Sequence, residues 1–355
     1  MFNTRSGHRP NLAHSRQPAG GPDWLKYVPA SVRGLVRSHL PAGLPDVGFT
    51  IGGAAPLPHA ATARATAPAG AQSLSRTFGN AAGTRPYKLY VPSGYAGQPV
   101  PLIVMLHGCT QSPDDFAAGT GMNAAAEAQT FLVAYPGQTQ GAQAQKCWRW
   151  FNPEDQVRGS GEPSIIAGIT REVMQDFAID PRRVFVAGLS AGGAAAAVMG
   201  SAYPDLYAAV GVHSGLACGA AHDLPSALAA MKRGGRGTPA GARPSRRAVP
   251  TIVFHGDRDA TVSPRNADAV VAQSLRDGAS STEAHSGQAP GGHAYTRTIS
   301  LDRSGQAVAE QWVIHGAGHA WSGGTEAGSY TDPRGPDATA EMLRFFGDHP
   351  MPPLR

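Results

Sequence analysis

The chain has 355 residues, of which 41% are hydrophobic and 15% charged, and this composition is typical of a globular protein rather than a disordered one. The formal charge of +5 comes mainly from arginines, which are scattered along the chain apart from a cluster in one Gly- and Pro-rich loop (231–250). Because they form no recognition motif, the charge does not indicate a nucleic-acid partner. No segment approaches the roughly 18–20 consecutive apolar residues of a membrane helix, and the three cysteines match neither a disulfide scaffold nor a zinc site.

The N-terminal part of the sequence differs from the rest. Residues 1–23 are polar and lack the apolar core of a secretory signal, so they do not predict export. Residues 24–40 carry apolar residues at helical intervals and predict a short helix, whereas residues 51–72 are dominated by Ala, Gly and Pro, as in a linker. We therefore expect an N-terminal extension over 1–75, serving as a dimer arm or a lid, and one catalytic domain over 76–348.

Downstream of the extension, apolar β-rich runs alternate with helical ones. This pattern predicts an α/β fold with a mostly parallel central sheet and helices on both faces. The helical pattern is clearest over Ser164–Phe177, with Pro163 suited to the first turn. The predicted strands are Tyr87–Val91, Leu102–Leu106, Phe131–Tyr135, Arg183–Ala187, Ala208–His213, Thr251–Phe254 and Gln311–Ile314.

The strongest chemical signal is a Gly-x-Ser-x-Gly segment, Gly188 to Gly192, with Ser190 at its centre. It follows a predicted strand and opens the helix-forming stretch Ala194–Ala202. A strand–turn–helix of this kind leaves little room for side chains beside the serine, which explains the flanking glycines, and it exposes the hydroxyl at a helix N-terminus. Ser190 is therefore the predicted nucleophile.

A serine hydroxyl needs a histidine base, and that base needs a carboxylate to fix its tautomer. In folds with such a turn, the acid and then the histidine follow the serine along the chain. The predicted strand Thr251–Phe254 ends in a segment with two carboxylates, Asp257 and Asp259. We expect Asp259 to be the acid, with Asp257 as the competing candidate.

The base is expected just after the predicted strand Gln311–Ile314. His319 lies there in a loop of small residues, Gly316 to Ala320, and is the predicted base. His293 and His315 are weaker candidates. Hydrolysis by these groups requires no cofactor and no metal.

The negative oxygen formed when an ester is attacked needs backbone N–H donors fixed in advance. One donor is expected from Ala191, which follows the serine. The second is expected from the loop after Leu102–Leu106, where Gly108 allows close approach and the amide of Cys109 is the predicted donor.

Together these segments resemble the polyhydroxybutyrate (PHB) depolymerase family of esterases, which is related to feruloyl and acetylxylan esterases and has the α/β-hydrolase fold. The resemblance extends roughly from residue 87 to residue 346. It is carried by Leu106-His107-Gly108-Cys109-Thr110-Gln111, Cys147-Trp148-Arg149-Trp150-Phe151, Asp180-Pro181-Arg182-Arg183-Val184, the Ser190 turn, His213-Ser214-Gly215-Leu216, His255-Gly256-x-x-Asp259 and Gly318-His319-Ala320-Trp321-Ser322-Gly323.

The resemblance implies a serine carboxylester hydrolase with the triad Ser190, Asp259 and His319, in agreement with the residue-level reasoning. It implies that Trp148 and Trp321 line a substrate groove, although burial in the core is the competing interpretation for these aromatic residues. It also suggests a disulfide between Cys109 and Cys147 that braces the oxyanion loop. Relatives are often extracellular and some carry polymer-binding modules, for which this sequence shows no counterpart.

Several questions stay open at this level. The expected substrate is PHB, its oligomers or related short-chain esters, with feruloyl, acetylxylan or aromatic-polyester esters as alternatives. The same triad also serves acyltransferases and peptidases, and a non-catalytic binding protein with this fold is the alternative of another class. The sequence predicts no membrane insertion and leaves open whether the chain is a monomer or a homodimer.

Overall fold

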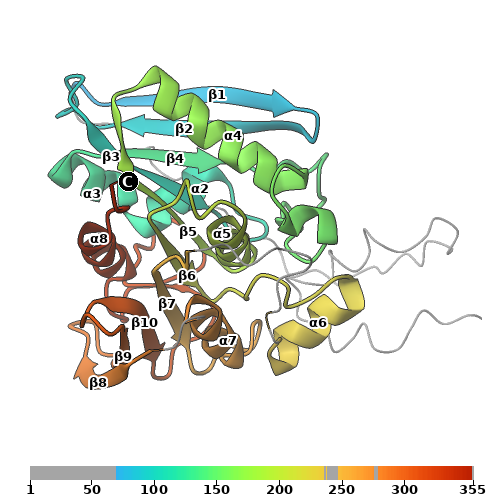
Figure 1. Cartoon of the computed structure of the whole chain (residues 1–355), viewed down its shortest axis with the longest axis vertical. Coiled ribbons are helices and arrows are strands. Elements are labelled where there is room, and N and C mark those ends of the chain that lie inside the picture. The colour runs from blue at the N-terminus through green and yellow to red at the C-terminus, as the bar shows by residue number, and fades with distance from the viewer. Residues whose placement is uncertain (1–68, 236, 238–246, 276–278, 354–355) are drawn as a thin grey trace, which may run out of the picture.

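The computed structural model of the chain describes residues 69–235, 237, 247–275 and 279–353 (Figure 1). The helix predicted over 24–40 and nearly all of the expected extension lie outside these residues. Within the described ranges, no helix has the length and apolar character needed to cross a membrane.

In the described part of the chain, ten strands form one sheet in the order β1-β2-β4-β3-β5-β6-β7-β10-β9-β8. Every neighbouring pair from β4 through β10 in this order is parallel, while the pairs at both edges are antiparallel. The strands are β1 (Gln72–Asn80), β2 (Gly83–Val91), β3 (Val100–Leu106), β4 (Leu132–Pro136), β5 (Ile179–Leu189), β6 (Ala209–His213), β7 (Thr251–Gly256), β8 (Ser281–Gln288), β9 (Ala294–Leu301) and β10 (Ala307–Ile314).

The central strands are apolar on both faces because both faces are covered. In β3, Leu102 and Val104 belong to one hydrophobic cluster, whereas Ile103 and Met105 belong to the other. Successive side chains of a strand point to opposite faces, so a continuous apolar run contributes side chains to both hydrophobic clusters. The sheet therefore has a hydrophobic layer on each side.

The helices divide between these two layers. Side chains of α4, α5, α6 and α7 join the first cluster, and those of α2, α3 and α8 join the second; Figure 1 shows α4, α5 and α7 lying across the sheet. The helices are α2 (Pro113–Thr120), α3 (Met122–Gln129), α4 (Gly161–Asp176), α5 (Ala191–Ala202), α6 (Leu224–Arg233), α7 (Arg265–Ser274) and α8 (Ala338–Asp348), with a 3-10 turn, η2 (Pro153–Gln156), and a small sheet of β11 (Trp321–Ser322) and β12 (Thr331–Asp332).

The strands predicted from apolar runs are all present, with ends that differ by a few residues, and the predicted helix is α4. The strands β1, β8 and β9 were not predicted. β1 and β8 are the edge strands and are largely exposed, and β9, next to β8, is only partly buried, so all three lack the apolar signal that marks a buried strand. Because β1 begins at Gln72, residues 72–75 belong to the sheet rather than to the expected extension.

Candidate active site

Ser190 lies between the end of β5 and the start of α5, at the carboxyl edge of the parallel strands. Its backbone has φ 59° and ψ −119°, a conformation that non-glycine residues rarely adopt. The Ser190 amide donates to the His213 carbonyl oxygen at 2.9 Å, which ties the turn to the end of β6. The strained turn predicted around the serine is therefore present, held by the neighbouring strand.

The glycines on either side of Ser190 are needed for close packing. A side chain at Gly188 would overlap with the backbone of Gly192, and one at Gly192 would overlap with the carbonyl groups of Leu106 and His107. The start of α5 thus packs directly against the end of β3. Only residues without a Cβ allow this approach.

The predicted acid and base are joined by a hydrogen bond. The Nδ1 atom of His319 donates to Oδ2 of Asp259 at 2.7 Å, while Oδ1 of Asp259 accepts the backbone amides of Thr261 at 2.9 Å and Val262 at 2.8 Å. Burial opposes the charged carboxylate, but hydrogen bonds from His255 and His319 outweigh it and hold the pKa of Asp259 well below its usual range. Asp259 is a buried, ionised partner for His319.

The competing candidates form separate pairs. The carboxylate of Asp257 lies 3.0 Å from Nδ1 of His315 and accepts the Gly316 amide at 2.7 Å. His293 contacts Asp332, with 3.0 Å between Nε2 and Oδ2. Because these side chains are engaged with one another, none of them replaces Asp259 or His319 in the pair described above.

Ser190 and His319 line the same pocket, which has a volume of about 360 Å³ including space open to solvent. Among the described residues, no Asp, Glu, Lys or Arg lines it, and its exposed surface is mainly apolar. The remaining lining residues are Gly108, Cys109, Gln111, Leu189, Met231, Thr261 and Tyr330. The structure therefore brings Ser190 and His319 to one pocket, with Asp259 hydrogen-bonded to His319 behind it.

The two predicted oxyanion donors come from two segments that border the serine. Cys109 lines the pocket, and Ala191 is the first residue of α5. Within the described part of the chain, neither amide has an intramolecular acceptor. A Cβ built on Gly108 would lie 3.6 Å from the Ser190 Cβ, so the loop passes close to the nucleophile.

The oxyanion loop is braced by the segment that follows β4. The disulfide suggested by the family resemblance is present between Cys109 and Cys147, which confirms that prediction. The Gln138 amide donates to Nε2 of His107 at 3.0 Å, and the indole N–H of Trp148 donates to the His107 carbonyl at 3.1 Å. Burial lowers the pKa of His107 to about 4, so its ring is neutral and accepts the first of these bonds.

The expected substrate-binding role of Trp148 and Trp321 has to be corrected. Both side chains are 1% exposed, and neither lines the pocket. The indole N–H of Trp148 is used by the oxyanion loop, and that of Trp321 donates to Thr339 at 3.1 Å. Buried tryptophans whose N–H groups are satisfied inside the protein are core residues, which was the competing interpretation.

The aromatic residue that does line the pocket is Tyr330, which the sequence reasoning missed. It is 39% exposed and is the one exposed large hydrophobic side chain among the described residues. Its hydroxyl lies 3.2 Å from the hydroxyl of Thr110, next to Cys109. Tyr330 sits in a Gly- and Ser-rich loop without periodicity, so no local pattern singles it out. Met231 of α6 and Thr261, which also line the pocket, were missed as well.

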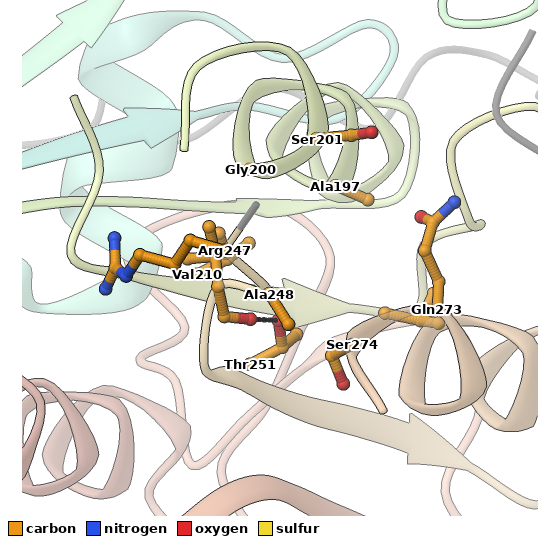
Figure 2. A pocket seen from close by; sticks show the side chains of 11 residues that line it. Ala197, Gly200, Ser201, Val210, Arg247, Ala248, Thr251, Gln273 and Ser274 are labelled. Atoms are coloured by element: carbon orange, nitrogen blue, oxygen red, sulfur yellow. Dashed lines mark hydrogen bonds between the residues drawn. The ribbon is translucent and has the colours of Figure 1, made fainter. Parts of the chain in front are cut away.

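A second pocket, of about 410 Å³, lies between α5, α7 and the N-terminal ends of β6 and β7, at Val210 and Thr251 (Figure 2). Its larger polar side chains are already engaged: Arg247 donates to backbone carbonyl groups, and Gln273 pairs with the backbone of a neighbouring loop. Ligands of open α/β sheets bind beyond the carboxyl ends of the strands, where Ser190 lies, and this pocket is at the opposite ends. We therefore assign the candidate site to the Ser190 pocket.

The disulfide gives a testable expectation for stability. Cys109 and Cys147 are 38 residues apart, and closing a loop of that length stabilises a fold by about 3–4 kcal/mol through the entropy of the unfolded chain. We expect the Cys109→Ala/Cys147→Ala variant to lose a comparable free energy of unfolding in urea titrations. Cys218→Ala, which removes the buried cysteine outside the disulfide, is the control and is expected to lose less. Equal losses in the two variants would contradict a bracing role.

The strand order, the serine turn between β5 and α5 and the histidine after β10 define the α/β-hydrolase fold. Comparison with solved structures agrees: an acetyl xylan esterase from Aspergillus awamori superposes with a TM-score of 0.61 at 21% identity, covering 78% of this chain and 99% of that one. At this identity the likeness concerns the fold alone.

Sequence comparison identifies the family. The model of the family described as "Esterase PHB depolymerase" matches residues 85–293, more than half of the chain, including Ser190 and Asp259. The chain therefore belongs to this family. Poly(3-hydroxyalkanoate) depolymerase C of Paucimonas lemoignei is 33% identical over 250 residues, 67% of this chain and 59% of that protein. An acetylxylan esterase of Coprinopsis cinerea is 31% identical over 154 residues, 43% of this chain and 40% of that protein. The chain thus matches well under two thirds of either relative's length.

Proposed function

We propose that this protein is a serine carboxylester hydrolase that works through an acyl-enzyme. The observation that carries the proposal is the shared pocket of Ser190 and His319, with His319 hydrogen-bonded to the buried carboxylate of Asp259. Family membership supports it. We also propose residues 72–348 as the catalytic domain.

In the first half of the cycle, His319 takes the proton of Ser190 as the serine oxygen attacks the ester carbonyl carbon. The carbonyl oxygen becomes negative and accepts hydrogen bonds from the amides of Cys109 and Ala191. His319 then returns its proton to the departing alcohol oxygen, and the acyl group stays on Ser190. In the second half, water attacks the acyl-enzyme with the same histidine as base, releasing the acid and restoring the serine.

The pocket favours an uncharged ester. In the part of the chain that the structure describes, no carboxylate, ammonium or guanidinium lines it, and its apolar walls include Leu189, Met231 and Tyr330. A hydroxyalkanoate chain has no charge between its ends, and the similarity to a poly(3-hydroxyalkanoate) depolymerase supports this substrate class. We propose PHB, its oligomers and related short-chain esters as substrates, with acetylated or feruloylated sugars as the alternative, which the similarity to an acetylxylan esterase supports.

A substrate panel tests this choice. Specificity constants are measured for 3-hydroxybutyrate trimers, an acetylated xylo-oligosaccharide, a feruloyl ester and an aromatic polyester fragment, and release of soluble acid is followed from solid PHB. We expect the hydroxybutyrate trimer to have the highest kcat/KM. A higher value for a sugar ester would move the assignment to the alternative. Hydrolysis of the matching amide at a comparable rate would indicate a peptidase.

Tyr330 offers a prediction about substrate contact. Truncation to alanine removes the exposed aromatic wall of the pocket and is expected to raise KM for the preferred ester roughly tenfold, with kcat changed less than about threefold. Tyr330→Phe keeps the ring and loses only the contact with Thr110, so its KM is expected to stay close to that of the unmodified protein. Steady-state kinetics on the same ester decide the matter, and an unchanged KM in the alanine variant would remove Tyr330 from the substrate site.

The proposed setting of the enzyme is extracellular. The Cys109–Cys147 disulfide supports an oxidising compartment, because intracellular thiols are usually kept reduced. Fractionation of the producing cells, with activity assayed in the medium and in lysate, tests this. Activity confined to the lysate would contradict it.

A further inference from the structure

A second histidine, which is buried, contacts the carboxylate of Asp259. His255 lies near the end of β7 and is 1% exposed. Its Nε2 atom is 2.9 Å from the carbonyl oxygen of Val262 and 3.3 Å from Oδ2 of Asp259. The carbonyl oxygen of Val262 can only accept a hydrogen bond, and so can the ionised carboxylate of Asp259. The Nε2 atom of His255 therefore carries the proton.

The two ring nitrogens of His255 have different surroundings. Its Nδ1 atom is buried and has no hydrogen-bond partner among the described residues. A proton there would be a buried donor without an acceptor, which is costly. His255 therefore places its Nε2–H within hydrogen-bond distance of the Val262 carbonyl oxygen, at 2.9 Å, and beside Oδ2 of Asp259, at 3.3 Å.

With this N–H group, both oxygens of the Asp259 carboxylate have more than one donor nearby. One oxygen, Oδ1, accepts two backbone amides, and the other, Oδ2, is approached by the N–H groups of both His319 and His255. His319 lines the pocket, but His255 does not. Of the two histidines, only His319 reaches the reacting groups, so His255 acts on the reaction through Asp259.

We propose that His255 is a positioning residue of the esterase: its N–H fixes the Asp259 carboxylate in the rotation that aligns His319 with Ser190. This inference rests on the proposed function. Losing one hydrogen bond to a charged group is expected to lower kcat roughly 10- to 100-fold. KM should change less than about twofold, because the pocket walls are untouched.

The chain allows a matched test. In His255→Gln the side-chain amide nitrogen can occupy the position of Nε2 and keep the donor, whereas in His255→Asn the shorter amide falls at the Nδ1 position and cannot reach Asp259. We expect the Asn variant to show the loss in kcat and the Gln variant to retain kcat within about threefold. His255→Leu replaces the Asn variant if the latter does not fold. His349→Asn, at a buried histidine of the C-terminal segment, is the control and should keep kcat.

A measurement that does not need substrate separates this inference from the proposed function. Proton NMR of the full chain follows the low-field signal of the Nδ1 proton shared by His319 and Asp259. The signal is expected to persist in His255→Gln and to shift or disappear in His255→Asn. Equal kcat values and unchanged signals in both variants would overturn the role of His255. An unmodified protein that hydrolyses no ester would instead overturn the proposed function, while the NMR comparison would still decide on His255.

Discussion

Replacing Ser190 by alanine is expected to lower kcat for a chromogenic short-chain ester roughly 10⁴- to 10⁶-fold. The reason is that Ser190 carries the only hydroxyl of the turn between β5 and α5, where it shares a pocket with His319 and precedes the helix N-terminus. Residual hydrolysis would come from the oxyanion amides and from binding alone. Initial rates measured with protein at high concentration give the size of the loss.

Ser201→Ala is the matched control for this experiment. Ser201 lies at the other end of α5 and lines the second pocket, so the same chemical change there should leave kcat near that of the unmodified protein. A fluorophosphonate probe should label the protein and its Ser201→Ala variant but not Ser190→Ala. Activity retained after the Ser190 change would place the nucleophile elsewhere, and an unmodified protein that resists the probe would favour a non-catalytic binding protein.

Replacing Asp259 by asparagine is expected to lower kcat roughly 10³- to 10⁴-fold while KM changes little. The amide has almost the same shape, but it cannot stabilise the cation that forms on His319, and it allows the wrong ring tautomer. Asp257→Asn is the matched control, because Asp257 pairs with His315 instead. Its kcat should stay within about threefold. The reverse ranking of the two variants, measured on one ester under identical conditions, would transfer the acid role to Asp257.

These two experiments address different parts of the same assembly. The serine variant tests the group that forms the covalent bond, whereas the aspartate pair tests which carboxylate orients the base. Because residues of a triad act as a unit, the Ser190→Ala/Asp259→Asn double variant should be hardly slower than Ser190→Ala alone.

Much of the fold was accessible from the sequence because the central strands are buried on both faces. Segments such as Leu102–Leu106 are apolar at every position, and this pattern predicts a buried strand without knowledge of the strands that pair with it. Edge strands carry no such signal: β8 is exposed along nearly its whole length, and its place in the sheet depends on pairing with β9. Long-range pairing of polar strands is decided by tertiary contacts.

The choice among the site residues shows the same division. The Gly188–Gly192 pattern identified Ser190 because a tight turn imposes its glycines within five residues of the chain. No such local rule separates Asp257 from Asp259, which stand two positions apart after the same strand. Only the folded chain shows that the second one meets His319 and the first meets His315.

By itself, the sequence determined the tight turn at Ser190 and the apolar strands of the parallel sheet, since each leaves its pattern within a short window of the chain. The tertiary structure alone decided that Trp148 and Trp321 are core residues, that Tyr330 forms a pocket wall and that His255 shares the carboxylate of Asp259. The direction in which a side chain points, and what it meets, depends on how distant segments pack against one another, and no window of the sequence contains that information.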